Sequence, residues 1–187
     1  MRKLIVISAP SGAGKTSIVH YLLKNMPSLS FSVSACSRKK RANEIEGKDY
    51  YFLDTEGFKA KIKKGDFLEW EEVYKDQFYG TLKSEIERIS NQGKTPIFDV
   101  DVVGGLNIKN KYPEECLAIF IMPPSISALK KRLSDRGSES EKSLEMRINI
   151  AEQEILRNNE FDRVILNNDF NAACEETRKL IIKFINS

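Results

Sequence analysis

Short apolar runs rich in β-branched residues recur along the chain, and each is followed by turn residues and then by a segment with helical periodicity. Strands that alternate with helices pair in parallel, because each helix carries the chain back across one face of the sheet. The pattern therefore predicts an α/β fold with a parallel sheet flanked by helices. The predicted strands are residues 4–7, 96–100, 117–122 and 164–166, and the predicted helices are residues 16–25, 126–135, 144–159 and 172–185.

The pattern changes in the region that ends near residue 82. Residues 31–34 alternate between apolar and polar, residues 50–53 and 67–73 resemble short strands, and residues 55–64 predict a helix that ends at Gly65. This mixture predicts an inserted α+β lobe. We therefore expect a core made of residues 1–33 and 83–187, an inserted lobe over residues 34–82, and a short helical lid over about residues 125–159, where residues 136–143 are rich in Gly, Ser and Glu.

The length and charge of the chain limit its possible partners. Its 187 residues suffice for one α/β domain with a small insertion, and a net charge of +3 is spread without a long basic arm. Small anions fit this charge better than nucleic acid does. The first apolar run is too short for a signal peptide and no run reaches membrane-spanning length, so we expect a cytoplasmic protein without membrane contact. The sequence leaves open whether it is a monomer or a homodimer.

The cysteines and the single histidine exclude several kinds of chemistry. Cys36, Cys116 and Cys174 are widely separated, which indicates buried residues and no disulfide framework or thiolate metal site. His20 is the only histidine, and it lies inside a predicted helix, where a histidine is more often a surface or packing residue than a catalyst. Ser-His-Asp and Cys-His mechanisms are therefore disfavoured. Any reaction must use carboxylates, arginines, lysines, hydroxyls and a metal bound mostly by oxygen.

Residues 9–16, which read APSGAGKT, match the phosphate-binding pattern G-x-x-x-x-G-K-[ST] except that Ala9 replaces the first glycine. The segment lies between a predicted strand and a predicted helix, a position that disfavours an ordinary glycine-rich turn. We expect a P-loop NTPase core in which main-chain N–H groups bind the β-phosphate, Lys15 reaches the β- and γ-phosphates, and Thr16 offers its hydroxyl to Mg²⁺. The residues expected to bind ATP here are Pro10, Ser11, Gly12, Ala13, Gly14, Lys15, Thr16 and Ser17.

A P-loop alone does not identify a reaction, because ATPases, GTPases and small-molecule kinases share it. Residues 101–104 satisfy the D-x-x-G pattern of a GTPase switch. The chain contains no N-K-x-D sequence to bind guanine at the donor site, so a signalling GTPase is a weak hypothesis.

Two arginines, Arg38 and Arg41, follow the alternating segment, and Tyr50 and Tyr79 lie elsewhere in the predicted lobe. A bare basic run usually forms a solvated surface. Guanidinium groups, however, match phosphate oxygens in paired geometry, and phenolic hydroxyls can donate to the same anion. The four side chains therefore predict a second phosphate site.

Several motifs in one order make the chain resemble the guanylate kinase family over nearly its whole length. The family segment V-S-x-T-T-R-x-P-R-x-G-E corresponds to residues 33–44, which keep both arginines but differ at four positions. Val103 replaces the glutamine of D-I-D-x-Q-G. The four differing residues are Cys36, Ser37, Lys40 and Asn43, and the remaining matches are Gly47, Tyr50 and Phe52, residues 67–70, 78–81, 123–125 and 167–169, and Arg132, Arg136 and Arg147.

The resemblance implies a nucleoside-monophosphate kinase that transfers a phosphoryl group from ATP to GMP, and also to dGMP, in purine nucleotide metabolism. It assigns the guanine base to Ser34, Glu69, Thr81 and Asp101, with Gly80 in the same motif, and the GMP phosphate to Arg38, Arg41, Tyr50 and Tyr79. Arg132, Arg136 and Arg147 would cover the transferring group from the lid, and Asn168 would lie against the adenine.

The residues themselves support two of these roles. Asp99 and Asp101 stand two apart at the end of a predicted strand, so their side chains share one face beside the P-loop. In this interpretation Asp99 and Thr16 bind Mg²⁺ or its water, and Asp101 faces the acceptor. A carboxylate at Glu69 can accept from guanine N1–H and N2–H₂ together, whereas adenine presents a lone pair at N1.

No general base is needed, because a nucleotide phosphate with a second pKa of about 6 is already largely ionised. Catalysis would then consist of alignment and charge neutralisation by Lys15, Mg²⁺ and the arginines, with both lobes closing to exclude water.

Two other functions remain open. The non-enzymatic guanylate-kinase-like modules of scaffold proteins keep this fold, but they typically lose the P-loop lysine, which is present here as Lys15. A kinase for another nucleoside monophosphate is the second alternative. Glu69 and Thr81 favour guanine, while Val103 leaves the details of the pocket open.

Overall fold

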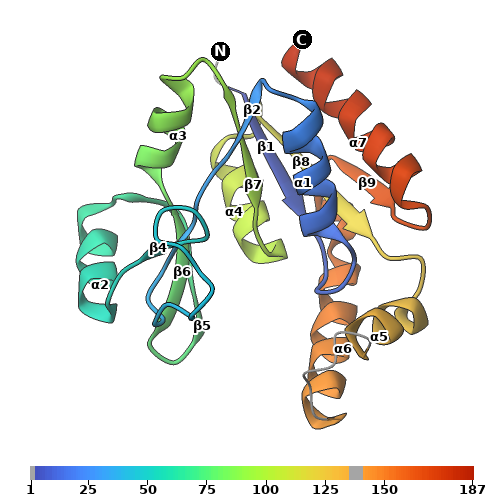
Figure 1. The fold of residues 1–187 in the computed structure, drawn as a ribbon, viewed down its shortest axis with the longest axis horizontal. Helices are drawn as coiled ribbons and strands as arrows, with labels where there is room; N and C mark the ends of the chain where they lie inside the picture. The colour runs from blue at the N-terminus through green and yellow to red at the C-terminus, as the bar shows by residue number, and fades with distance from the viewer. Residues whose placement is uncertain (1–2, 135–140) are drawn as a thin grey trace.

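The computed structural model describes residues 3–134 and 141–187 (Figure 1), and within them the chain forms two separate β-sheets. The first is a parallel sheet with the strand order β2-β7-β1-β8-β9, which confirms the predicted α/β class. Its strands are β1 (Leu4–Ser8), β2 (Leu29–Phe31), β7 (Thr95–Asp99), β8 (Cys116–Met122) and β9 (Arg163–Leu166).

Helices cover both faces of this sheet, because alternate residues of each strand point to opposite faces. Ile5 and Ile7 of β1 pack in one cluster with α1 and α7, whereas Leu4 and Val6 pack in the other with α3 and α4. Both faces are therefore dry, as expected for a parallel sheet. The four helices are α1 (Lys15–Asn25), α3 (Lys83–Ser90), α4 (Val102–Lys111) and α7 (Phe170–Ile185).

The second sheet is mixed and lies apart from the first, on the left of Figure 1. Its strand order is β4-β3-β6-β5, and α2 packs against it through Phe58, which is fully buried. Asp54 caps the start of α2 by accepting from Gly57 N at 2.6 Å, and Gly65, with φ of 71°, caps its end. These elements are β3 (Ala35–Cys36), β4 (Tyr51–Phe52), α2 (Thr55–Lys64), β5 (Phe67–Tyr74) and β6 (Gln77–Leu82).

Helices α5 (Ile126–Ser134) and α6 (Glu141–Leu156) pack against each other on the side of the molecule opposite the second sheet. The last residue predicted for the first of them, Asp135, lies outside the described residues. The predicted helix 144–159 ends early, at Leu156, because the side chain of Asn158 donates to Ile155 O at 2.7 Å and a short 3₁₀ turn follows at Asn158–Glu160. Among the described residues, every helix is too short or too polar to cross a lipid bilayer.

The sequence does not predict α4, because Gly104 and Gly105 lower its intrinsic helix propensity. One local and one tertiary feature support it nevertheless. Asp101 caps its first turn by accepting from Gly104 N at 2.7 Å. A Cβ at Gly105 would lie 2.3 Å from the hydroxyl of Ser8, so only glycine lets the helix approach β1 this closely.

The second sheet has its own small core, which gives a prediction for stability. Phe58 stacks on Phe67 with ring centroids 4.3 Å apart and on Phe78 at 5.5 Å. Phe58→Ala should lower the free energy of unfolding by about 3–5 kcal/mol, measured by urea denaturation, because the small cluster cannot refill the cavity. Phe170→Ala removes the same side chain from a position that is 41% exposed and should cost about 1 kcal/mol or less. Equal losses for both variants would contradict a separate core.

Candidate active site

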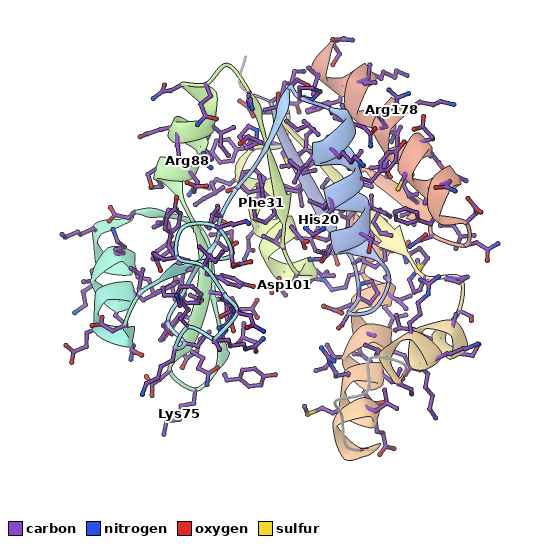
Figure 2. The ribbon with its side chains drawn as sticks, in the orientation of Figure 1. His20, Phe31, Lys75, Arg88, Asp101 and Arg178 are labelled. Atoms are coloured by element: carbon purple, nitrogen blue, oxygen red, sulfur yellow. The ribbon has the colours of Figure 1, made fainter. Side chains whose placement is uncertain are left out.

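A cleft of about 1100 Å³ lies between the P-loop, the carboxyl end of β7, the second sheet and α6. Figure 2 places Asp101 in the middle of the molecule, between the second sheet and the α5–α6 pair. Most of the site residues predicted from the sequence line this single cleft. They are Pro10, Ser11, Gly12, Gly14, Lys15, Thr16, Ser17, Ser34, Tyr50, Glu69, Tyr79, Gly80, Asp99, Asp101 and Arg147.

The P-loop adopts a backbone that requires glycine. Gly12 and Gly14 have φ of 88° and 97°, and a Cβ at Gly14 would lie 2.4 Å from Asn167 Nδ2. Ala13 N donates to Pro10 O at 3.0 Å, which closes the loop. Gly14 caps α1 without a side-chain hydrogen bond among the described residues, so the first N–H groups of the helix remain for an anion.

Lys15, Thr16 and Asp99 form the donor end of the cleft. The ammonium of Lys15 pairs with Asp99 and donates to Val100 O at 2.9 Å, and Thr16 Oγ1 donates to Asp99 Oδ2 at 3.1 Å. A hydroxyl and a carboxylate side by side are hard oxygen donors suited to Mg²⁺. Within the described residues, no group of three or more His, Cys, Asp or Glu could hold a metal, so any cation here would share its coordination with a ligand or with water.

The predicted phosphate site is partly assembled. Arg38 Nε donates to the hydroxyl of Tyr79 at 3.1 Å, and its guanidinium lies 5.1 Å from the ring centre of Tyr50. Its two Nη groups donate to the carboxylate of Glu44, at 2.7 and 2.5 Å, and Nη1 also donates to Lys39 O at 3.1 Å. These hydrogen bonds raise the pKa of Arg38 and lower the pKa of Glu44 to about 2. Neither Arg38, which is half-buried, nor Arg41, which is exposed, is among the residues that line the cleft. The backbone N–H of Arg41 also donates to Glu44.

The carboxylate of Glu69 is 8% exposed and accepts from Thr81 Oγ1 at 2.7 Å. Burial raises the pKa of Glu69 to about 7, and the nearby charge of Asp101 adds to this, against the lowering effect of the Thr81 hydroxyl. A Cβ at Gly104 would lie 3.1 Å from Glu69 Oε2 and 3.3 Å from Asp101 Oδ1, so both carboxylates pack closely against this glycine. Thr81 itself is fully buried behind Glu69.

Helix α6 contributes a residue that the sequence analysis does not identify. Glu154 lines the cleft together with Arg147, which stands seven positions earlier. Burial raises the pKa of Glu154 to about 7, and Asp101 raises it further while Lys15 opposes the shift. The signal available in the sequence was the spacing, because residues seven apart lie on one helix face two turns apart.

The remaining predicted residues lie behind the P-loop or outside the cleft lining. Arg132 donates to the carbonyl oxygens of Ala13, at 3.4 Å, and Asn167, at 3.3 Å. Asn167 is buried and donates to Ala13 O at 2.7 Å, whereas the predicted Asn168 is exposed and is not among the lining residues. The predicted Arg136 lies outside the described residues. Residues 167–169 match the family pattern in the sequence, but no local pattern indicates that Asn167 supports the P-loop from behind.

Comparisons with known proteins identify the family of this chain. The guanylate kinase family model matches residues 1–183. The chain is 49% identical to a guanylate kinase of Bacteroides thetaiotaomicron, over 98% of this chain and 90% of that protein, and 47% identical to one of Salinibacter ruber, over 100% and 98%. A crystal structure of guanylate kinase from Anaplasma phagocytophilum superposes with a TM-score of 0.77 at 28% identity, covering 97% of this chain and 85% of that one. The chain therefore belongs to the guanylate kinase family.

Proposed function

We propose that this chain transfers the γ-phosphoryl group of ATP to GMP across the cleft, giving ADP and GDP, with ATP on the P-loop and GMP on the second sheet. The observation that carries the proposal is that Lys15 with the P-loop, and Tyr50 with Tyr79 and Glu69, line one cleft. Two sites for anionic phosphate on one cleft suit direct transfer between two nucleotides. A scaffold module that only binds a peptide has no use for the donor half of this arrangement.

The P-loop would bind the donor through main-chain N–H groups and Lys15. The ammonium of Lys15 is already held toward Asp99 and Val100 O, so little side-chain freedom is lost when it contacts the β- and γ-phosphates. Arg147 from α6 lines the same cleft and would neutralise charge on the transferring group. Arg132 and Arg136 remain candidates for the same role after closure of α5 and α6 over the donor.

The acceptor would be held by its two ends. The phosphate would be bound by Arg38, Tyr50 and Tyr79, and by Arg41 from the exposed loop. The guanine would be bound by Ser34, Glu69, Thr81 and Asp101. Gly80 would allow β6 to lie against β5. A Cβ at Gly80 would lie 2.6 Å from Glu69 O, so this approach requires glycine. These contacts involve the base and the phosphate, so we extend the proposal to dGMP.

Thr16 and Asp99 are the residues that would hold Mg²⁺, since their oxygens are adjacent and face the donor end of the cleft. When bound, the ion would supply charge neutralisation to the donor phosphates. Asp99 would then exchange part of its contact with Lys15 for the metal. We further propose that the enzyme acts in the cytoplasm, in purine nucleotide metabolism.

The choice of acceptor gives the most direct test of this function. ADP release should be fast with GMP and dGMP and at least about 100-fold slower, as kcat/KM, with AMP, because AMP would leave the Glu69 carboxylate facing a lone pair. UMP and TMP should also be poor acceptors. A coupled ADP-release assay measures this, and a rate with AMP equal to that with GMP would exclude the guanine assignment.

The donor and acceptor assignments predict opposite kinetic effects. Lys15→Ala should lower kcat by about 10²–10³-fold, because a charge that stabilises the transition state is removed. Arg38→Ala should mainly raise the KM for GMP, by about 10–100-fold, through the loss of charge-assisted hydrogen bonds. Lys24→Ala, exposed on the same helix as Lys15, and Arg178→Ala on α7 are matched controls that should leave both constants unchanged. If Lys15→Ala mainly raised the KM for GMP and Arg38→Ala mainly lowered kcat, the donor and acceptor assignments would have to be exchanged.

The raised pKa of Glu69 predicts a pH dependence for GMP binding. The carboxylate must be ionised to accept from guanine, so the KM for GMP should rise about tenfold from pH 8 to pH 6 as Glu69 becomes protonated near pH 7. The stability of the free protein depends on pH in the opposite direction. The folded state holds the Glu69 proton more tightly than the unfolded chain, so the free energy of unfolding falls as pH rises from the unfolded pKa to about 7.

Glu69→Gln provides the control for this pH effect, because the variant keeps any contribution from ionisation of the GMP phosphate. Its KM for GMP should be higher than wild type at pH 8 and should change less between pH 8 and pH 6. If the wild type and the variant show the same pH profile, Glu69 does not titrate in GMP binding.

A further inference from the structure

The chain passes between the two sheets at two places that lie close together. The first passage follows β2: Ser32 N still donates to Ile97 O of the parallel sheet at 3.0 Å, and β3 of the second sheet begins at Ala35. The second passage joins β6, which ends at Leu82, to α3, which begins at Lys83. The first turns of α3 pack on the parallel sheet through Ile86. Any rotation of the second sheet relative to the first must take place at these two passages.

One buried carboxylate connects both passages to the second sheet. Glu85, on the first turn of α3, is 2% exposed. It accepts from Val33 N of the first passage at 2.8 Å, and from the hydroxyl of Tyr51 on β4 at 2.8 Å. Arg88 supplies two more hydrogen bonds, from Nε at 2.7 Å and Nη2 at 2.8 Å. All four acceptor positions of the carboxylate are therefore used.

Arg88 extends this connection back to the parallel sheet. Its Nη2 also donates to Phe31 O, the last residue of β2, at 3.1 Å, and Figure 2 shows Arg88 on α3. Burial alone would raise the pKa of Glu85, but hydrogen bonds from Arg88, Val33 N and Tyr51 outweigh it and lower the pKa. The carboxylate is thus held in its charged form at the junction of three chain segments.

The partners of Glu85 differ in what a rotation would do to them. Val33, Arg88 and Glu85 lie at the passages themselves. Tyr51 belongs to the second sheet, so its hydrogen bond is the one that responds to the angle between the sheets. Val33, Ser34 and Arg88 also line the cleft, which places this junction directly beside the proposed GMP site.

We propose that Glu85, held by Arg88, is a positioning residue for phosphoryl transfer: it fixes the two passages side by side and, through Tyr51, orients the second sheet so that GMP faces the P-loop. The proposal rests on the assignment of GMP to the second sheet. Glu85 is not among the residues that line the cleft. Only Glu85 of this ion pair is buried, since the side chain of Arg88 is 39% exposed. Such a pair is weak evidence for added stability, and the effect that we assign to it is to select one arrangement of the segments that it joins.

Two substitutions separate this role from simple stabilisation. Glu85→Gln keeps the shape of the side chain but removes its charge and replaces an acceptor with a donor, and Tyr51→Phe removes only the hydrogen bond from the second sheet. Glu87→Gln, exposed on the same helix, is the matched control. Steady-state kinetics give the separate KM values for GMP and ATP. Spin labels on exposed positions Lys63→Cys of α2 and Lys179→Cys of α7 give the distance between the sheets, since the three natural cysteines are buried.

We expect Glu85→Gln to raise the KM for GMP by about tenfold and Tyr51→Phe by about threefold, with the KM for ATP changed less than twofold, because misorientation weakens only the GMP side. Both variants should broaden the distance distribution, and Glu87→Gln should match the wild type. Lower thermal stability with unchanged GMP KM and unchanged distances would overturn the proposal.

If Glu85→Gln does not fold, Tyr51→Phe and Arg88→Lys decide the question by the same criteria. Arg88→Lys keeps the positive charge but loses the fork that binds Glu85 and Phe31 O together. The distance measurement does not depend on what the second sheet binds. An Arg38→Ala variant with an unchanged KM for GMP would therefore refute the GMP assignment, whereas unchanged distances in the Glu85 and Tyr51 variants refute the positioning role.

Discussion

Parallel pairing of β1 with β7 is the constraint on which the site depends. Its register sets Ile7 opposite Asp99, so the P-loop that follows β1 and the aspartates that follow β7 leave the sheet at the same edge. Because of this pairing, Asp99 contacts Lys15 and Thr16. Asp101, two residues later, caps α4 and meets Glu69 of the second sheet near Gly104. The donor and acceptor sides of the cleft are thus joined through one strand end.

The two cationic side chains that we propose bind phosphates are each paired with a carboxylate in this structure. Lys15 is paired with Asp99, and Arg38 is paired with Glu44 by two hydrogen bonds. Each cation is therefore kept in place and desolvated only in part before a nucleotide arrives, and each phosphate must compete with a carboxylate for it. The guanine side of the cleft differs, because its carboxylate is not paired with a cation among the described contacts. Glu69 is buried without a cationic partner among its described contacts, which is why its pKa is raised.

Local chemistry determined which parts could be predicted. The P-loop, the helix 55–64 with its end at Gly65, and the buried strands were predictable because short segments encode them directly. Helix α4 was not, since its glycines argue against a helix, and only the close approach of Gly105 to Ser8 and of Gly104 to Glu69 and Asp101 explains them. The support of the P-loop by Asn167 and the four hydrogen bonds of Glu85 join residues far apart in the chain, so no local pattern reveals them.

The central claim is that two anion sites face each other across one cleft, and a single ligand can test it. A compound that joins adenosine and guanosine through a chain of phosphates would occupy both sites at once if they share the cleft. We predict that calorimetry will show one molecule bound per chain, at least about 100-fold more tightly than ATP or GMP alone, because linkage makes the second contact intramolecular. Binding no tighter than that of the separate nucleotides, or two molecules bound per chain, would contradict the account.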